Sequence, residues 1–442
     1  MVMEVVSVRY AGDSIGAVTF NTETGQGAFQ FEPAFLRKGL DMAPLMMPIE
    51  QAQQGRIFQF GHLNWETFKG LPGMIADALP DDFGNAVLNA WIARQGGKPA
   101  DISPLQRLQY TGQRGMGALS FSPSKRQKGL AASQDVALNE LVRMAQEVVD
   151  QRGGFEASLA QDHSEDADAM RQLLQVGMSA GGARPKAVLA FNQDLTQARS
   201  GQVDAPEGFT HYLMKFDGVS EHSAQSETFG DPLGYGAMEY VYYRMATEAG
   251  VEMSACHLLA EGNRRHFLTQ RFDRDGNHKK HVQTLNGIAH VDYKKPGSYS
   301  YYELFGIARA LKLPRHDAEQ LLHRMVFNIV ARNHDDHAKN FSFLMEDSGR
   351  WRLAPAYDLA YSYKPGSPWV NSHWMSLNNK RDDFNRDDIL TIQETVPSFS
   401  ARYINEVIDR VVESVSRWPT LAREWEVPER LRREVAGNLR LL

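Results

Sequence analysis

The segment RNHDDHAKNFSF, which starts at Arg332, constrains the fold more than any other part of the sequence. Asp335 is followed five residues later by Asn340, and NFSFLMEDSGRWRLAP then predicts two short strands around an Asp-Ser-Gly-Arg turn. This hairpin leads to a second aspartate, Asp358, in the segment PAYDLA. An aspartate, an asparagine five residues on, a hairpin and a further aspartate form the layout of a protein-kinase-type phosphoryl-transfer site.

Phosphoryl transfer requires a base that orients the attacking hydroxyl and oxygen ligands that hold Mg²⁺ against the phosphates. Asp335 is the predicted base, because it alone has the five-residue spacing to Asn340. Asn340 and Asp358 are the predicted Mg²⁺ ligands, since Mg²⁺ prefers hard oxygen donors. His337 and Lys339 fall between them, where a donor and a cation can steady the transferred phosphate.

Two other interpretations of the cluster stay open. A zinc or di-metal cage is disfavoured, because the adjacent residues 334–337 alternate faces in a strand and fan around the axis of a helix. His316 and His323 are further candidate ligands, but both lie among helical residues without an acidic partner pattern. A solvated polar turn after the helix DAEQLLHRMVFNIVA would be the simplest interpretation of the cluster taken alone.

A kinase-type site also needs a strand lysine that reaches the phosphates and a glutamate from the next helix that holds this lysine. Lys215 lies in the alternating strand HYLMKFDG, and Glu239 opens the predicted helix MEYVYYRM. Taken singly, Lys215 would be a solvent-facing strand lysine and Glu239 a charge that complements the helix dipole. Their order before Asp335 favours the functional interpretation.

Two further segments complete the predicted nucleotide site. In SAGGARPK, residues 179–186, Gly181 and Gly182 let backbone N–H groups approach a phosphate, although a turn at the entry of a strand is the structural alternative. TQRFDR occupies the position of an interlobe hinge, where the backbone of residues 270–272 would hold adenine beside the Phe272 ring. The glycine motif RGMGAL is interpreted as structural.

The overall composition sets the class of protein. The 442 residues carry a net charge of −6, so the bulk field favours neither nucleic acid nor an anionic membrane surface. One cysteine, Cys256, excludes a disulfide within the chain and is expected to be buried. The sequence shows no signal peptide and no apolar run of membrane-spanning length, so we expect a cytoplasmic protein without membrane association.

The segments SAGGARPK, HYLMKF, TQRFDR, NHDDHAKNFSF and PAYDLAYS together resemble the HipA family of bacterial serine/threonine kinases, the toxins of HipA–HipB type II toxin–antitoxin systems. DDHAKNFS is the most specific of these segments, and the likeness covers most of the chain. The resemblance implies an α+β fold that is bilobal and protein-kinase-like, with a β-rich N-terminal subdomain and an all-helical C-lobe. We predict the N-terminal subdomain at 1–125, a polar linker, the N-lobe at 135–298 and the C-lobe at 299–442.

The resemblance also implies residue roles and partners. Asp335 corresponds to the catalytic base, and Ser179 matches a serine that family members autophosphorylate, which silences the enzyme. The residues implied to contact ATP or Mg²⁺ are Gly181, Gly182, Ala183, Arg184, Pro185, Lys186, Lys215, Glu239, Gln270, Arg271, Phe272, His337, Ala338, Lys339, Asn340, Tyr357 and Asp358. Known family substrates are aminoacyl-tRNA synthetases, and the partner is a HipB-like helix-turn-helix antitoxin that brings the complex to operator DNA.

The sequence departs from the family pattern at Gly182, at Arg184-Pro185 and at Asp336, beside the predicted base. Three hypotheses follow. The first is an active kinase that autophosphorylates Ser179, the second a largely non-catalytic co-repressor bound to the antitoxin, and the third a small-molecule kinase on the same scaffold. The sequence predicts no role for His334 or Asp336.

Overall fold

The computed structural model describes residues 3–124, 136–150, 173–174, 177, 184–220 and 230–442. The chain forms two compact units. The first contains Met1–Met42, Met47–Gly236 and His257–Val282, and the second contains Ala43–Met46, Ala237–Cys256 and Gln283–Leu442. The predicted linker and the segment 179–183 lie outside the described residues, and the three domain boundaries stay predictions.

The first unit begins with a four-stranded antiparallel sheet in the order β3-β2-β1-β4. The strands are β1 (Met3–Tyr10), β2 (Asp13–Asn21), β3 (Gln26–Phe31) and β4 (Leu119–Ser122). Along β1, the buried residues Val6, Val8 and Tyr10 alternate with exposed ones, as a sheet with one covered face requires. The predicted strands VVSVRY, GAVTF and GAFQF are confirmed.

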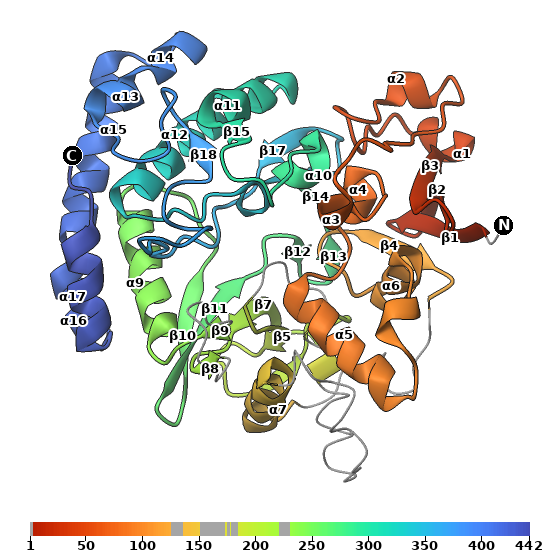
Figure 1. Cartoon of the computed structure of the whole chain (residues 1–442), viewed down its shortest axis with the longest axis horizontal. Coiled ribbons are helices and arrows are strands. Elements are labelled where there is room, and N and C mark those ends of the chain that lie inside the picture. Colours follow the sequence, from red (N-terminus) through yellow and green to blue (C-terminus); the bar gives the residue numbers. More distant parts are fainter. Residues whose placement is uncertain (1–2, 125–135, 151–172, 175–176, 178–183, 221–229) are drawn as a thin grey trace. The chain divides into compact units, whose positions relative to one another are not determined.

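A five-stranded sheet in the order β10-β11-β7-β5-β6 follows. Its strands are β5 (Lys186–Phe191), β6 (Ala198–Ser200), β7 (Thr210–Lys215), β10 (Cys256–Glu261) and β11 (Arg264–Gln270). The helices α5 (Asp82–Arg94) and α7 (Leu138–Asp150) lie beside these strands (Figure 1). Val87, Leu141, Leu189, Met214 and Leu268 share one buried core, so apolar packing joins both helices to the sheet.

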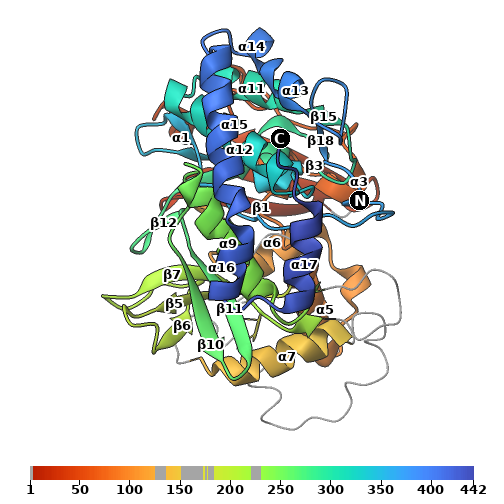
Figure 2. The same cartoon turned by 90° about the vertical axis from the view of Figure 1, so that its left-hand side faces the viewer.

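The second unit is built around α12 (Arg315–Val330), whose residues from Gln320 to Val330 are all buried. It packs against α15 (Ala401–Ser416), which leads into α16 (Trp418–Glu424), as Figure 2 shows. Cys256 is buried, as predicted. The other long helices of this unit are α9 (Tyr235–Glu248, from Ala237 on), α11 (Tyr301–Ala310) and α17 (Glu429–Asn438).

The prediction of an all-helical C-lobe is wrong. β16 (Ser342–Met345) and β17 (Trp351–Leu353) form the antiparallel hairpin that the sequence predicts, and β15 (Tyr299–Ser300) pairs in parallel with β18 (Met375–Ser376). These strand pairings fix the positions of the loops that carry the short strands. Within the described residues, no helix is both long and apolar enough to cross a bilayer.

Short elements connect these parts. They are α1 (Pro33–Leu36), α2 (Ile49–Ala52), α3 (Trp65–Phe68), α4 (Gly73–Ala76), η1 (Pro99–Asp101), α6 (Pro104–Thr111), β8 (Val219–Ser220), β9 (Gly230–Asp231), β12 (Arg274–Asp275), β13 (His278–Lys279), β14 (His281–Thr284), α10 (Leu285–Ala289), η2 (Ala338–Asn340), α13 (Arg386–Leu390) and α14 (Ile392–Thr395).

Candidate active site

The candidate catalytic loop, residues 332–340, begins where the buried helix α12 ends. Arg332 has a left-handed backbone with φ 58°, which turns the chain away from the helix axis. Its guanidinium lies 4.0 Å from the centre of the Tyr363 ring and donates to Asp382 Oδ1 at 2.8 Å. A cation–π contact and an ion pair therefore fix the start of the loop.

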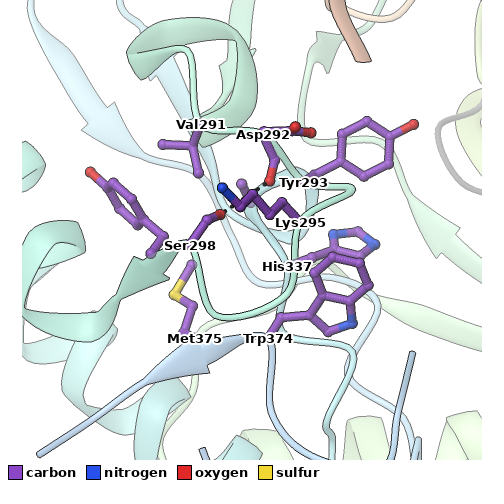
Figure 3. A pocket seen from close by; sticks show the side chains of 10 residues that line it. Val291, Asp292, Tyr293, Lys295, Ser298, His337, Trp374 and Met375 are labelled. Atoms are coloured by element: carbon purple, nitrogen blue, oxygen red, sulfur yellow. Dashed lines mark hydrogen bonds between the residues drawn. The ribbon is translucent and has the colours of Figure 1, made fainter. Parts of the chain in front are cut away.

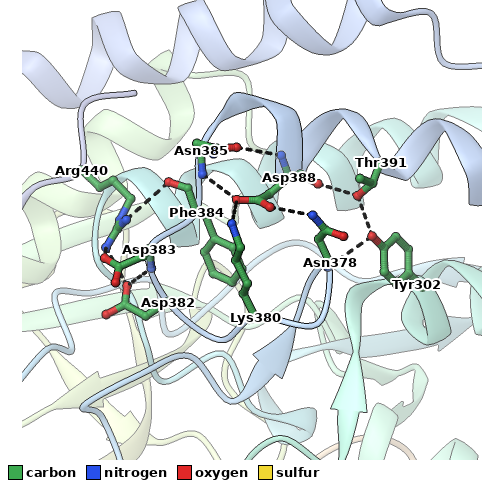
Figure 4. A network of polar contacts seen from close by, with 10 residues as sticks. All are labelled: Tyr302, Asn378, Lys380, Asp382, Asp383, Phe384, Asn385, Asp388, Thr391 and Arg440. Atoms are coloured by element: carbon green, nitrogen blue, oxygen red, sulfur yellow. Dashed lines mark hydrogen bonds and ion pairs between the residues drawn. The ribbon is translucent and has the colours of Figure 1, made fainter.

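Asp382 also binds Arg440, near the C-terminal end of the described chain. Arg440 Nη2 lies 2.6 Å from Asp382 Oδ1 and 3.2 Å from Asp383 Oδ1 (Figure 4). Burial alone would raise the pKa of Asp382, but the Asp383 N–H and the charges of Arg332 and Arg440 outweigh it and lower this pKa. Asp382 thus joins the catalytic loop to a segment more than one hundred residues away in sequence.

Asp335, the predicted base, presents its carboxylate to solvent. Its side chain is 39% exposed, and Oδ1 lies 3.6 Å from His337 Nε2. The neighbouring Asp336 is fully buried. Accessibility therefore supports Asp335, chosen from spacing, as the carboxylate that can meet a hydroxyl group of another molecule.

Asn340 is oriented by the loop itself. Its Nδ2 donates a 2.7 Å hydrogen bond to the backbone carbonyl of Asp335. The side-chain amide nitrogen is used in this way, so the amide oxygen Oδ1 is the atom that remains for a cation. This bond also ties the predicted base and the predicted Mg²⁺ ligand to one another.

Tyr357 connects the hairpin to the catalytic loop. Its hydroxyl donates to the Lys339 carbonyl at 2.6 Å and is paired with Ser342 Oγ. The residue before Asp358 is thereby bonded to the residue before Asn340. Asn333 Nδ2 also contacts the Asp358 carbonyl at 3.4 Å.

The hydrogen bonds made by Asn340 and Tyr357 fit a Mg²⁺ site of the kinase type. Mg²⁺ in such sites is bound by one or two protein carboxylates, with waters and phosphates supplying the remaining ligands. In the predicted site, the Asp358 carboxylate and the Asn340 amide oxygen would supply two of the protein ligands. Among the described residues, no group of three or more His, Cys, Asp or Glu side chains is arranged to hold a metal ion, which leaves the cage interpretation without structural support.

Asp336 has a structural role that the sequence did not reveal. Its carboxylate accepts hydrogen bonds from the Tyr301 hydroxyl at 2.6 Å, from His373 Nδ1 at 2.9 Å and from the Trp374 backbone N–H at 2.6 Å. Burial by itself would raise the pKa of Asp336, but His373 and the other hydrogen bonds lower this pKa below its usual value. A buried, ionised Asp336 therefore fastens the catalytic loop to the segment 373–376.

His334 is also buried, and its ring lies 4.1 Å from the His373 ring and 5.0 Å from that of Tyr363, centre to centre. Burial, followed by the nearby charges of His373 and Arg332, lowers the pKa of His334 to about 3. In this stack a neutral His334 imidazole packs against the rings of His373 and Tyr363. The structure thus gives roles to both residues that the sequence left unassigned.

His337 and Lys339 line one side of the loop. The His337 ring lies 5.6 Å from the centres of Tyr293 and of Trp374, with edge-on geometry to both. Lys339 Nζ lies 4.5 Å from the centre of the Tyr293 ring. Ala338, between them, is buried. The aromatic surroundings position both side chains, and their predicted contact with phosphate stays a prediction.

In the first unit, Lys186 and Lys215 are direct cross-strand partners on β5 and β7. Both are buried, with exposures of 2% and 5%, and Lys215 Nζ lies 5.9 Å from the Phe267 ring. Paired residues on neighbouring strands share one face of a sheet, and like charges there disfavour each other. The register therefore concentrates positive charge, which suits a site for phosphates.

The other predicted residues have mixed placements. Arg184 lies 5.8 Å from the Tyr235 ring, Pro185 is buried next to it, and Glu239 is buried on α9 in the second unit. The pairing of Glu239 with Lys215 stays a prediction. Ser179, Gly181, Gly182 and Ala183 lie outside the described residues.

The predicted hinge follows β11. Gln270 ends this strand, Phe272 is half-buried, and the Arg271 backbone N–H donates to the His211 carbonyl at 2.9 Å. That N–H is used within the sheet and is not available to adenine, and the predicted hinge contact stays a prediction.

A buried ionic cluster beside the hinge is not evident from the sequence. Asp273 binds Arg271 at 2.6 Å and Arg274 at 2.7 Å, and it accepts the Gly117 N–H at 2.7 Å. Burial would raise the pKa of Asp273, but the two arginines lower it strongly. The motif RGMGAL is therefore structural, as predicted, because its backbone is bound by this cluster.

Comparison with models of protein families matches residues 178–418 to the HipA-like C-terminal domain and residues 6–122 to the HipA N-terminal domain. The first match alone covers more than half of the 442 residues. The chain belongs to the HipA family.

Curated relatives agree with this assignment. A protein of Sinorhizobium fredii named Putative kinase Y4mE is 28% identical over 197 residues, which are 41% of this chain and 42% of the relative. A Haemophilus influenzae protein named Putative kinase is 26% identical over 217 residues, 46% of this chain and 58% of the relative. The chain thus matches about half the length of these relatives.

The fold is shared with a solved structure. A chain of the Shewanella oneidensis MR-1 toxin–antitoxin complex of HipA, HipB and operator DNA superimposes with a TM-score of 0.65. The match covers 98% of this chain and 94% of that chain at 16% sequence identity. At this identity the likeness defines the mixed α/β fold of the HipA family.

Proposed function

We propose that the chain is an ATP- and Mg²⁺-dependent serine/threonine protein kinase that acts as the toxin of a type II toxin–antitoxin pair. Two hydrogen bonds carry the proposal. Asn340 donates to the Asp335 carbonyl, and Tyr357, the residue before Asp358, donates to the carbonyl of Lys339, the residue before Asn340. An exposed carboxylate, an amide fixed by the carbonyl of that same residue, and an aspartate tethered through Tyr357 are the parts that phosphoryl transfer requires. The names of the two relatives support kinase activity.

In this proposal, Asp335 accepts a hydrogen bond from the acceptor hydroxyl and takes its proton as the new oxygen–phosphorus bond forms. The bond between the γ-phosphorus and the bridging oxygen of ATP breaks, and ADP leaves. Asn340 Oδ1 and the Asp358 carboxylate would hold Mg²⁺, which when bound neutralises phosphate charge. Lys186 and Lys215, with His337 and Lys339, would contact the phosphates, and the hinge would contact adenine.

The proposed acceptors are Ser179 of the chain itself and a protein of the translation machinery, such as an aminoacyl-tRNA synthetase. The proposed partner is a HipB-like helix-turn-helix antitoxin that brings the complex to operator DNA. The chain carries a net charge of −6, so most of the affinity for DNA would come from the partner. A largely non-catalytic co-repressor is the alternative, supported by the HipB and operator DNA in the Shewanella complex.

A direct test uses phosphatase-treated protein incubated with Mg-ATP and analysed by intact mass. We expect one added phosphate on the wild type, none on Ser179→Ala at that position, and none on Asp335→Asn or after chelation of Mg²⁺. An unmodified wild type, or equal phosphate on Asp335→Asn, contradicts the proposal. Growth arrest on expression that Asp335→Asn relieves separates the kinase from the co-repressor.

A further inference from the structure

Asp358, a predicted Mg²⁺ ligand, is supported by bonds other than those that hold the catalytic loop. The hydrogen bonds of Asp336 hold the loop on the side where His337 and Trp374 lie (Figure 3). Asp358 is reached through the hairpin instead, and its backbone is left-handed with φ 52°. Residues with a side chain adopt this conformation rarely, so the structure around them must hold it in place. The bonds of the segment before Asp358 therefore determine where this predicted ligand lies.

This segment is bonded to the turn that follows α9. The Ala356 N–H donates to the Glu252 carbonyl at 2.8 Å, and Met253 pairs with Ala356 in a parallel bridge. Ala356 is buried, and Asp358 follows it by two residues. A shift of Glu252 would consequently displace the backbone that carries Asp358.

The turn itself closes α9 with a Schellman motif. Gly250 has φ 87°, the Gly250 N–H donates to the Thr247 carbonyl at 3.0 Å, and the Val251 N–H donates to the Ala246 carbonyl at 2.9 Å. The Gly250 carbonyl and the Glu252 N–H lie outside this motif. Both groups therefore need partners from another element.

Gln320 of α12 is the partner of both groups. Its Oε1 accepts the Glu252 N–H at 2.8 Å, and its Nε2 donates to the Gly250 carbonyl at 3.0 Å. Gln320 is buried, as are its neighbours on this helix. A single side-chain amide thus joins α12 to the turn, and the turn joins α12 to the segment before Asp358.

Both predicted Mg²⁺ ligands are in this way positioned from the same helix. Asn340 lies in the loop that begins where α12 ends, and Asp358 is bonded back to α12 through Glu252 and Gln320. Mg²⁺ requires near-ideal octahedral geometry, so the separation of its protein ligands must be held closely. We propose that Gln320 is a positioning residue for this Mg²⁺ site and acts on Asp358 through the backbone of the turn after α9. The inference rests on the proposed kinase function and adds to it a residue outside the predicted site.

The test compares Gln320→Met with wild type in the intact, phosphatase-treated chain. Methionine keeps the length of the side chain and removes both hydrogen bonds. With a non-hydrolysable ATP analogue bound, the dissociation constant of Mn²⁺, measured by electron paramagnetic resonance, should rise about fivefold, the equivalent of one neutral hydrogen bond. The Mg²⁺ concentration for half-maximal phosphorylation should rise equally, while the rate at saturating Mg²⁺ stays within about twofold of wild type.

Two comparison variants separate positioning from a general loss of stability. Gln320→Glu keeps an acceptor for the Glu252 N–H. Arg324, one turn further along α12, has Nε and Nη1 groups without acceptors among the described residues, and it can pair with the new carboxylate. Gln393→Met removes a similar bond in α14, from Gln393 Nε2 to the Phe399 carbonyl at 2.9 Å. Both variants should keep the wild-type affinity for Mn²⁺.

A double substitution tests the route through Asp358. In an Asp358→Asn background, Gln320→Met should cause no further loss of Mn²⁺ affinity. An affinity unchanged in Gln320→Met, an equal loss in either comparison variant, or a full further loss in the Asp358→Asn background overturns the positioning role alone. A wild type that binds no Mn²⁺ and gains no phosphate overturns the kinase proposal and this inference with it.

Discussion

Replacement of Asp336 by asparagine should destabilise the protein although the side chain keeps its size. Asp336 Oδ2 accepts from both Tyr301 and His373, while Oδ1 accepts from the Trp374 N–H. The best orientation of the amide keeps its oxygen toward the first two donors and turns its NH₂ group toward Trp374. The Trp374 N–H is then buried without an acceptor, which costs about 1–3 kcal/mol.

The loss of charge adds to this cost. Hydrogen bonds to charged groups contribute about 1.5–3 kcal/mol, against about 1 kcal/mol for neutral ones. Together the two effects predict that the free energy of unfolding falls by about 2–4 kcal/mol. Urea unfolding at pH 7, followed by circular dichroism, measures this change.

The neighbouring carboxylate is the matched control. Asp335→Asn alters a side chain that is 39% exposed and should change the free energy of unfolding by less than about 0.5 kcal/mol, while it abolishes phosphorylation. Equal unfolding midpoints for Asp336→Asn and wild type, or an equal loss in both variants, would refute the assignment of separate roles.

The pH dependence gives a second measurement of the same interaction. Burial alone would raise the pKa of Asp336 in the folded state, but His373, Tyr301 and the Trp374 N–H outweigh it and lower this pKa. A lowered pKa stabilises the folded state at pH values above the ordinary pKa of 3.8, and this stabilisation disappears as the pH falls through the folded pKa. The difference between wild type and Asp336→Asn should therefore shrink below about pH 4.

Three further substitutions test other ion pairs and hydrogen bonds of the structure. Arg440→Gln removes the contact with Asp382 and should lower the free energy of unfolding by about 1–2 kcal/mol, because that ion pair is mostly buried. Asp273→Asn leaves two buried arginines without their carboxylate and should cost about 3–5 kcal/mol, measured by the same urea unfolding. Tyr357→Phe should cost about 1 kcal/mol and raise the Mg²⁺ concentration for half-maximal phosphorylation severalfold, because the bond to Lys339 is lost.

Each of these has a control of the same chemistry elsewhere in the chain. Arg433→Gln breaks an exposed ion pair with Glu429, Asp275→Asn alters an exposed carboxylate two residues from Asp273, and Tyr403→Phe removes a hydroxyl far in sequence from the loop. The first two should change the unfolding free energy by less than about 0.5 kcal/mol. A control whose free energy of unfolding falls as much as that of its partner variant would contradict the stabilising role of the corresponding contact. A Mg²⁺ dependence unchanged in Tyr357→Phe would contradict the role of the bond between Tyr357 and Lys339.

The features that the sequence predicted well depend on local spacing. The five-residue interval from Asp335 to Asn340 and the turn between β16 and β17 are set by residues close together in the chain. The structure confirms the hairpin, and it adds a hydrogen bond from Asn340 to the Asp335 carbonyl that was not predicted. Apolar periodicity likewise predicted α12. The structure confirms this helix, and nearly all of its residues after the first turn are buried.

The features that it missed depend on distant partners. The donors to Asp336 lie 35 to 38 residues away, and Asp273 binds Gly117 across 156 residues. The sequence around Asp336 carries no sign of these contacts, since two adjacent aspartates look alike whether or not one of them is buried. The parallel pairing of Tyr299 with Met375 was missed for the same reason, whereas the all-helical C-lobe was an expectation taken from the family resemblance.

The two adjacent aspartates, Asp335 and Asp336, are coupled through the backbone that they share. From His334 to Ala338, buried and partly exposed residues alternate, as expected where successive side chains of an extended segment point to opposite sides. Three hydrogen bonds hold Asp336 inward, and this alternation then directs Asp335 outward, toward solvent. Asp336, which looked like a departure from the family pattern, therefore orients the predicted base by fixing the backbone on which both residues sit.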